Sequence, residues 1–499
     1  MEKPNVVVIL LDCVRSDHCS ICGYERRTTP GLERLGERTV VYENAISPAI
    51  WTMASLASLF TGTYPSAHRF VRLGQAFPTE LRMLAEALRD AGYQTLGLGT
   101  WIPFFGFGGL DRGFEQFEPK MRPAWWRRAY RRVSALGKGG EEAAQPAPST
   151  EPGAEAMPAA PAGEGEFTKW LKWQVSKVAD KGAKRILDLT ADRIRRRDPD
   201  KPFFAYVHMG EAHGPYHPPW PYRNKYVPRE LKHIDARRIN QDPMPYYLGE
   251  KPIRPEEFRV LEALYDGAIE YQDKVVCGFY RQLERMGLAE NTMFVVLADH
   301  GECIGEKGLF RHSFCVYEPI VRVLLTVIYP DVPGRHEPRI VQSLDLPRTI
   351  AELAGVDGGF MDQQQGNSLL EPGTGARPDD FAVTELVKPL SRQRLEAGAP
   401  LACYNHGIIG LRSAEHKYIW RTTGQEEFYC LRTDPAEEHN RMGDPEVRQA
   451  VDRLRTRGGP YLTRFTDAYT EVQHLLTSGE APGMSEEVEA RLRDLGYVD

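Results

Sequence analysis

Aliphatic runs alternate with segments of helical period along the first part of the chain. After its first residue, the run at residues 5–11 contains only valine, isoleucine and leucine, which is typical of a strand buried on both faces. The series continues with a helix expected at 30–38, a strand at 40–44, helices from Thr52 and at 80–91, and a strand at 94–99. Such alternation predicts a mainly parallel α/β sheet flanked by helices.

The same alternation resumes near residue 167. We expect a helix within 167–196, a strand at 202–209, a helix at 256–286, and strands at 292–297 and 322–328. Past residue 379 the segments shorten, with strands expected at 381–387, 407–412 and 417–421 and helices at 446–455 and 486–495. The pattern predicts an α/β domain over residues 1–378 and a smaller C-terminal α+β subdomain, with an antiparallel sheet, over residues 379–499.

An insertion separates the two series of strands. Residues 137–166 are rich in alanine, proline, glycine and glutamate, a composition that predicts a disordered linker dispensable for chemistry. The preceding residues 125–132 are basic and aromatic. We favour a helix whose long side chains cover part of the fold, and a surface that binds a membrane or a partner is the alternative.

Composition excludes some classes of function. The 63 lysines and arginines face 69 aspartates and glutamates, and a net charge of -6 gives no basic field for nucleic acid. We find no apolar run long enough to span a bilayer and no signal peptide pattern, so we expect a cytoplasmic protein. The eight cysteines are scattered, which fits reduced thiols better than a disulfide framework.

Polar side chains stand where buried strands end. Asp12 follows the first strand, and Asp299 and His300 follow the strand at 292–297. Because ligands collect at the carboxyl ends of parallel strands, we expect these side chains to converge. Thr52 adds a hydroxyl at the start of a helix.

Each of these residues alone has an ordinary structural explanation, as a helix N-cap or a surface hydrogen bond. Together, at separate strand and helix ends, they predict a divalent metal site. Carboxylate, hydroxyl and imidazole ligands suit Ca²⁺, Mg²⁺, Mn²⁺ or Zn²⁺, so the ligand set does not select the ion.

Several motifs, in order along the chain, resemble the sulfatase family within the alkaline phosphatase superfamily. The matching runs are residues 5–18, 28–32, 57–65, 298–302 and 317–323, with support from 366–370, 428–431, 434–435 and 495–498. The resemblance covers nearly the whole chain outside the linker. It implies an alkaline-phosphatase-like α/β fold, and a divalent metal that serves hydrolysis of sulfate or phosphate esters.

The chain departs from the family pattern at two places. Sulfatases proper carry a cysteine or serine that becomes formylglycine, in a motif that continues with proline and arginine. This chain has Thr52, Ala54 and Leu56 there. A threonine nucleophile instead resembles the phosphodiesterase, nucleotide pyrophosphatase and phosphotransferase branches. Cys13 stands where many members place a second metal-binding aspartate.

Coordination to a cation is one of few ways to activate a threonine hydroxyl at neutral pH. The helix that begins at Thr52 adds backbone N–H groups and a positive dipole end, which favour an alkoxide and a bound oxyanion. Attack by Thr52 would give a covalent ester that water later hydrolyses.

Other residues are expected around this centre. His213 matches the family's substrate-facing histidine, and His312 resembles an active-site position that protonates the leaving group. Arg15 and Lys307 are candidate cations for the oxygens of a sulfuryl or phosphoryl group, or surface charges. Glu211 is an alternative ligand, with His213 or His312, for a second metal.

Three classes of function follow. A hydrolase of a sulfate, phosphate or phosphonate ester is preferred, with a phosphodiester slightly favoured because of Thr52. The substrate would be a small molecule or an ester derived from a saccharide or lipid. A transferase using the same intermediate is second, and a non-catalytic binding protein is third. Leu56 and Trp101 replace polar residues of many relatives, but retention of the metal-site residues argues against lost chemistry.

Overall fold

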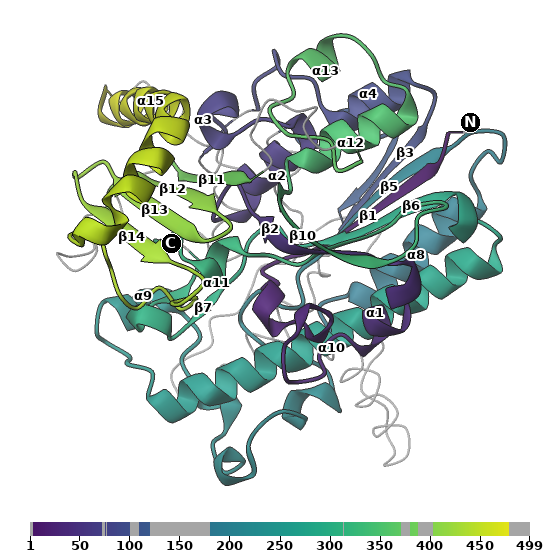
Figure 1. The fold of residues 1–499 in the computed structure, drawn as a ribbon. Helices are drawn as coiled ribbons and strands as arrows, with labels where there is room; N and C mark the ends of the chain where they lie inside the picture. Colours follow the sequence, from purple (N-terminus) through teal and green to yellow (C-terminus); the bar gives the residue numbers. More distant parts are fainter. Residues whose placement is uncertain are drawn as a thin grey trace, which may run out of the picture.

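An eight-stranded, mainly parallel sheet forms the centre of the protein, in the strand order β10-β2-β9-β6-β1-β5-β3-β4 (Figure 1). The computed structural model describes residues 3–71, 75, 77–99, 109–119, 180–312, 314–370, 380–387 and 403–478. The strands are β1 (Asn5–Leu11), β2 (Val40–Ile46), β3 (Gln94–Gly99), β4 (Gln116–Pro119), β5 (Phe203–Met209), β6 (Thr292–Leu297), β9 (Leu325–Ile328) and β10 (Arg335–Gln342). Among the described strands of this sheet, only β9 runs antiparallel to both of its neighbours.

β1 lies between β5 and β6 and fixes where the strand ends meet. All seven residues of β1 are buried, as expected for a parallel strand covered on both faces. The register pairs Leu10 with His208 of β5 and with Leu297 of β6. The carboxyl ends of these three strands therefore reach the same edge of the sheet.

Helices cover both faces of the sheet, with α2, α4 and α12 on one side and α1, α8 and α10 on the other (Figure 1). Their bounds, with those of the shorter α-helices, are α1 (Pro30–Arg34), α2 (Thr52–Thr61), α3 (Pro65–His68), α4 (Leu84–Asp90), α8 (Ala183–Arg195), α9 (Pro243–Tyr247), α10 (Pro255–Arg285), α11 (Glu318–Val321), α12 (Asp345–Ala354) and α13 (Gly359–Asp362). The alkaline-phosphatase-like α/β fold expected from the sequence is confirmed.

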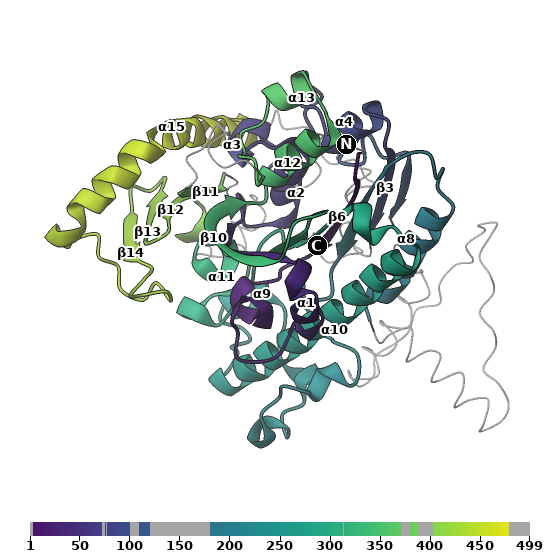
Figure 2. The same ribbon diagram turned by 45° about the vertical axis from the view of Figure 1, so that its right-hand side comes forward.

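A four-stranded antiparallel sheet follows in the C-terminal part. It contains β11 (Phe381–Leu386), β12 (Ile408–Ser413), β13 (His416–Arg421) and β14 (Glu426–Cys430) in sequential order. The long helix α15 (Arg448–Ser478) runs along this sheet (Figures 1 and 2). A short hairpin of β7 (Cys303–Ile304) and β8 (Phe310–Arg311) lies between β6 and α11 in the chain.

A buried cluster of charges joins the C-terminal sheet to α11. The Lys417 ammonium lies 3.0 Å from carboxylate oxygens of both Glu318 and Glu437, and Arg412 also pairs with Glu318. Glu437 accepts a hydrogen bond from the backbone N–H of Glu318. Breaking one member of such a buried network leaves a charge unpaired, so the cluster holds the two parts together.

Several expected boundaries change in the structure. The helix expected at 80–91 begins at Leu84, where the Glu86 carboxylate accepts the Met83 N–H. The helix expected at 30–38 ends at Arg34 and gives way to a short 3-10 helix. The linker at 137–166, the basic aromatic segment at 125–132 and the helix expected at 486–495 lie outside the described residues. No described helix has the length and hydropathy needed to cross a membrane.

Candidate metal and ester site

The ends of β1, β5 and β6 bring two carboxylates and two imidazoles together. The backbone N–H of Asp12 donates to the Met209 carbonyl, which continues the β1–β5 ladder to the edge of the sheet. His208 Nε2 lies 3.2 Å from Asp12 Oδ2. His300 Nε2, after β6, lies 3.4 Å from Asp299 Oδ2 and 3.9 Å from Asp12 Oδ1.

Thr52 reaches this group from the start of α2. Its Oγ1 lies 3.2 Å from His300 Nε2, and the side chain is half-buried. Hydroxyls of Ser47 and Ser55, on either side of Thr52, both donate to the Asp299 carbonyl, which fixes the loop before α2 against the end of β6. The structure thus brings Asp12, Thr52, Asp299 and His300 to one place.

The charges of this group favour a bound cation. Asp12 and Asp299 are almost fully buried, and Asp299 Oδ2 accepts no hydrogen bond from any described group. Burial and then the charge of Asp12 raise the pKa of Asp299. Burial disfavours a charged imidazole, yet the carboxylates of Asp299 and Asp12 raise the pKa of His300. Two adjacent buried carboxylates with an oxygen left without a donor fit a divalent ion, which would satisfy both.

Cys13, His213 and His312 lie beside this group. The Cys13 thiol donates to Asp12 Oδ1 over 3.1 Å and lies 3.6 Å from His312 Nδ1. The rings of His213 and His312 are 5.1 Å apart between centroids, and those of His300 and His312 are 4.3 Å apart. Burial lowers the pKa of His213 to about 3, and burial and then His300 lower the pKa of His312.

Residues 4–356 match the family model described as Sulfatase, and residues 305–458 match that of the N-sulphoglucosamine sulphohydrolase C-terminal region. The chain belongs to the sulfatase family. The protein is therefore an ester hydrolase. Members of this family generally use a divalent metal ion.

Known relatives cover the chain almost completely. An arylsulfatase of Clostridium perfringens is 24% identical over 95% of this chain and 97% of its own length. A solved structure of a protein in complex with its substrate D-glucosamine-2-N,6-O-disulfate superposes with a TM-score of 0.66 at 17% identity, over 93% and 99% of the two chains. The phosphonate monoester hydrolase of Agrobacterium radiobacter gives a TM-score of 0.66 at 20% identity, over 93% and 96%.

The two cations expected near the ester in this sulfatase-family protein, Arg15 and Lys307, contact other groups. The Arg15 guanidinium pairs with Asp17 and Glu306 and donates to the Glu302 carbonyl, so its charge is already balanced. The Lys307 ammonium donates to the Glu437 carbonyl and lies over the rings of Tyr317 and Tyr429. The structure does not place either of them at the cluster of Thr52 and His300.

Glu211 also has a structural role. Its carboxylate accepts the backbone N–H groups of Lys181 and Ala183 and so holds the chain where α8 begins. These contacts do not place Glu211 with His213 and His312 as a metal ligand. Leu56 is buried in α2, and Trp101 lies outside the described residues.

The sequence did not predict three residues of the site, which are His208, Glu302 and Arg311. His208 contacts Asp12 from inside the apolar run of β5. Glu302 is fully buried, with His312 Nδ1 2.7 Å from one oxygen and Arg311 3.2 Å from the other. Burial opposes ionisation of Glu302, but Arg311 and His312 hold the pKa of its carboxyl well below the usual range. The available signal for His208 was an imidazole at the next-to-last position of an otherwise mainly apolar strand.

Gly301 lets the loop after β6 approach the backbone of α11. Its N–H donates to the Ile320 carbonyl over 2.6 Å, and a side chain Cβ at this position would stand 2.0 Å from the Pro319 carbonyl oxygen. This close approach requires glycine.

We therefore expect Gly301→Ala to lower the free energy of unfolding by about 1–3 kcal/mol, because backbone must move to relieve the clash. Thermal unfolding followed by circular dichroism measures the effect. Gly36→Ala is the control, because a Cβ at Gly36 meets no atom within 4 Å. Equal unfolding temperatures for the two variants would contradict the steric argument.

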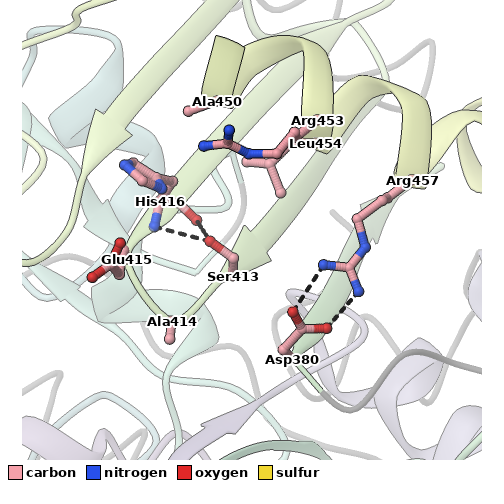
Figure 3. A pocket seen from close by; sticks show the side chains of 9 residues that line it. All are labelled: Asp380, Ser413, Ala414, Glu415, His416, Ala450, Arg453, Leu454 and Arg457. Carbon is pink, nitrogen blue, oxygen red and sulfur yellow. Dashed lines mark hydrogen bonds and ion pairs between the residues drawn. The ribbon is translucent and has the colours of Figure 1, made fainter.

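A surface pocket of about 270 Å³ lies elsewhere, between α15 and the hairpin of β12 and β13 (Figure 3). Figure 3 shows Arg457 facing the carboxylate of Asp380 and His416 beside Ser413. One contact between Arg457 and Asp380 measures 2.8 Å. Its charged walls are partly paired with each other, and none of the residues expected at the metal site lines it.

Proposed function

We propose that the protein hydrolyses a sulfate, phosphate or phosphonate ester through a covalent ester on Thr52. The contact that carries this proposal is the 3.2 Å between Thr52 Oγ1 and His300 Nε2, at the start of a helix and beside two buried carboxylates. The family match supports ester hydrolysis. The threonine nucleophile rests on the position of Thr52 in this cluster.

Asp12, Thr52, Asp299 and His300 are the residues that we propose hold the divalent cation. When bound, such an ion lowers the pKa of a coordinated hydroxyl and offsets negative charge on ester oxygens. His300 is kept in place by its Nδ1 contact with the Gly301 carbonyl, 3.0 Å away, which directs Nε2 toward Thr52.

Thr52 Oγ1 loses its proton to solvent and attacks the sulfur or phosphorus atom, and the bond from that atom to the leaving oxygen breaks. The first N–H groups of α2 have no partner within the helix, so they can bind the oxygens of the transferred group. Water then attacks the same atom, the bond to Thr52 Oγ1 breaks, and Thr52 regains a proton. Sulfate, phosphate or a phosphonate is released.

The class of ester and the cytoplasmic location stay predictions. The slight preference for a phosphodiester depends only on Thr52 in place of a formylglycine precursor. The neighbour bound to D-glucosamine-2-N,6-O-disulfate makes a sulfated saccharide a natural test compound. Proton donation to the leaving oxygen by His312, and a substrate contact by His213, also stay predictions from the sequence.

A panel of 4-nitrophenyl esters, which share one leaving group, together with a glucosamine sulfate tests the reaction. Protein loaded separately with Ca²⁺, Mg²⁺, Mn²⁺ or Zn²⁺ is assayed with 4-nitrophenyl sulfate, phosphate, phenylphosphonate and a phosphodiester, and with a glucosamine sulfate. We expect hydrolysis of at least one class. Product formation with an added alcohol at the expense of water would favour the transferase instead.

Rapid-quench mass spectrometry tests the covalent step. We expect a phosphoryl or sulfuryl group on the peptide that contains Thr52 during turnover, and no such group after the substrate is exhausted. Turnover without any adduct on this peptide, when quenched within the first cycle, would contradict covalent catalysis at Thr52.

A further inference from the structure

Two buried cysteines lie in contact beside the short hairpin of β7 and β8. Cys303 is on β7, Cys315 follows β8 in the chain, and their Sγ atoms are 3.9 Å apart. Both thiols are free, and the two residues are only 1% and 3% exposed. The ester chemistry proposed above does not use them.

Apolar packing keeps the two sulfur atoms close together. Residues of α11 and of all four strands of the C-terminal sheet belong to the same buried cluster as Cys303 and Cys315. Phe314, next to Cys315, stacks on Tyr404 with 4.5 Å between the ring centroids. The hairpin itself is much less extensive, because only two residues of each strand are paired.

The segment between the two cysteines carries two residues of the site. Arg311 and His312 both contact the carboxylate of Glu302, which directly precedes Cys303. A bond between Cys303 and Cys315 would therefore close a loop that contains Arg311 and His312 and begins beside Glu302.

We propose that a peroxide converts Cys303 and Cys315 into a disulfide, which tethers the segment of Arg311 and His312. With hydrogen peroxide, the Cys315 sulfur first takes up one oxygen and becomes a sulfenic acid, and water leaves. The Cys303 sulfur then attacks the Cys315 sulfur, the S–O bond breaks, and hydroxide leaves with the Cys303 proton as a second water molecule. The two thiols are oxidised, and the O–O bond of the peroxide is reduced.

The order of the two steps follows from the surroundings of Cys303. The hydrogen bond with Cys315, and then burial, hold the pKa of the Cys303 thiol well above its usual range, so we assign the first step to Cys315. Buried thiols react slowly. However, a hairpin of two-residue strands opens locally at low cost, which admits a molecule as small as hydrogen peroxide. A disulfide needs about 2 Å between the sulfur atoms, so the two segments have to approach only slightly.

Peptide mapping of the whole protein tests the bond. Reduced, folded protein is treated with hydrogen peroxide in the presence of a chelator, free thiols are blocked with N-ethylmaleimide, and the protein is digested with trypsin without reductant. Trypsin cleaves after Lys307 and Arg311, so a bond between Cys303 and Cys315 joins two separate peptides. We expect this pair of peptides from most chains, at a peroxide concentration that also oxidises the exposed Cys403, and we expect reductant to separate it.

Thermal unfolding and hydrogen exchange measure the tether. Closing the loop should raise the unfolding temperature of the oxidised wild type by at least about 3 °C and slow amide exchange over residues 304–312. Cys315→Ala should lose both effects of peroxide. Cys430→Ala, changed at a half-buried cysteine on β14, is the control and should keep them.

The mapping of the wild type does not depend on whether Cys315→Ala folds. Unmodified thiols at Cys303 and Cys315 after complete oxidation of Cys403 would overturn the proposal. Sulfinic acid at either residue in place of the bond, or equal unfolding temperatures of the oxidised and reduced wild type, would also overturn it. Since no ester is present in these measurements, inactivity toward every ester tested would not affect the result.

Discussion

We expect Thr52→Ala to reduce kcat by at least about a thousandfold, while the protein keeps its fold and the divalent cation proposed at Asp12, Asp299 and His300. The reason is that the alanine variant lacks the attacking oxygen, whereas Asp12, Asp299 and His300 keep the charge that holds the ion. Steady-state kinetics with the best ester of the panel and metal analysis of the purified variant measure the two parts of this expectation.

Two further substitutions at Thr52 test what the attacking group must be. One keeps the hydroxyl and removes the methyl group, and the other introduces a thiol. Thr52→Ser should retain measurable activity, because the attacking oxygen survives. Thr52→Cys should not acquire formylglycine, because Ala54 and Leu56 replace the proline and arginine that the modifying enzyme recognises. Wild-type rates in the alanine variant would rule out Thr52 as the nucleophile.

Asp299→Asn should remove the divalent ion and reduce kcat/KM by more than about a hundredfold, since it deletes a charged ligand. In the metal-free protein the same change should raise the unfolding temperature near neutral pH. Burial and the charge of Asp12 raise the pKa of Asp299, so its ionised form destabilises the folded state.

Because folding raises the pKa of Asp299, the stability of the metal-free protein should depend on pH. A carboxyl whose pKa is raised by folding favours the folded state at pH values below its unfolded pKa, and this contribution is lost as pH rises through the folded pKa. Thermal unfolding in chelator should therefore show a smaller loss of stability from acid to neutral pH in Asp299→Asn than in the wild type. Asp452→Asn, changed at an exposed aspartate, is the control. A lower unfolding temperature of metal-free Asp299→Asn at neutral pH would contradict the charge argument.

The sequence predicted where Asp12 and Asp299 lie because parallel strands present their carboxyl ends at one edge. It did not predict His208, because the seven residues of β5 are buried and the histidine interrupts an otherwise apolar run only near its end. The expectation for Lys307 depended on the need for a cation near the oxygens of the sulfuryl or phosphoryl group. In the structure its backbone has a φ of 52°, and the side chain contacts the C-terminal part, which no local pattern indicates.

Fold prediction had similar limits. β10 was missed because its first residues are charged and exposed and it contains Pro338, features of an edge strand that resemble a loop. The helix expected at 446–455 continues to Ser478 through two glycines and Pro460. Phe465, Ala468 and Val472 are buried in the core of the C-terminal part, and this packing outweighs the weak local preference for helix.

The position of β1 in the sheet has a consequence for synthesis on the ribosome. β1 precedes the other described strands of the central sheet along the chain, but its neighbours β5 and β6 begin at Phe203 and Thr292, so it has no sheet partner until much of the chain has emerged. Contacts between segments so distant in sequence form slowly. The nascent chain therefore carries an almost wholly aliphatic strand without a sheet partner until β5 has been made, and Asp12 meets Asp299 and His300 only after β6 has been made.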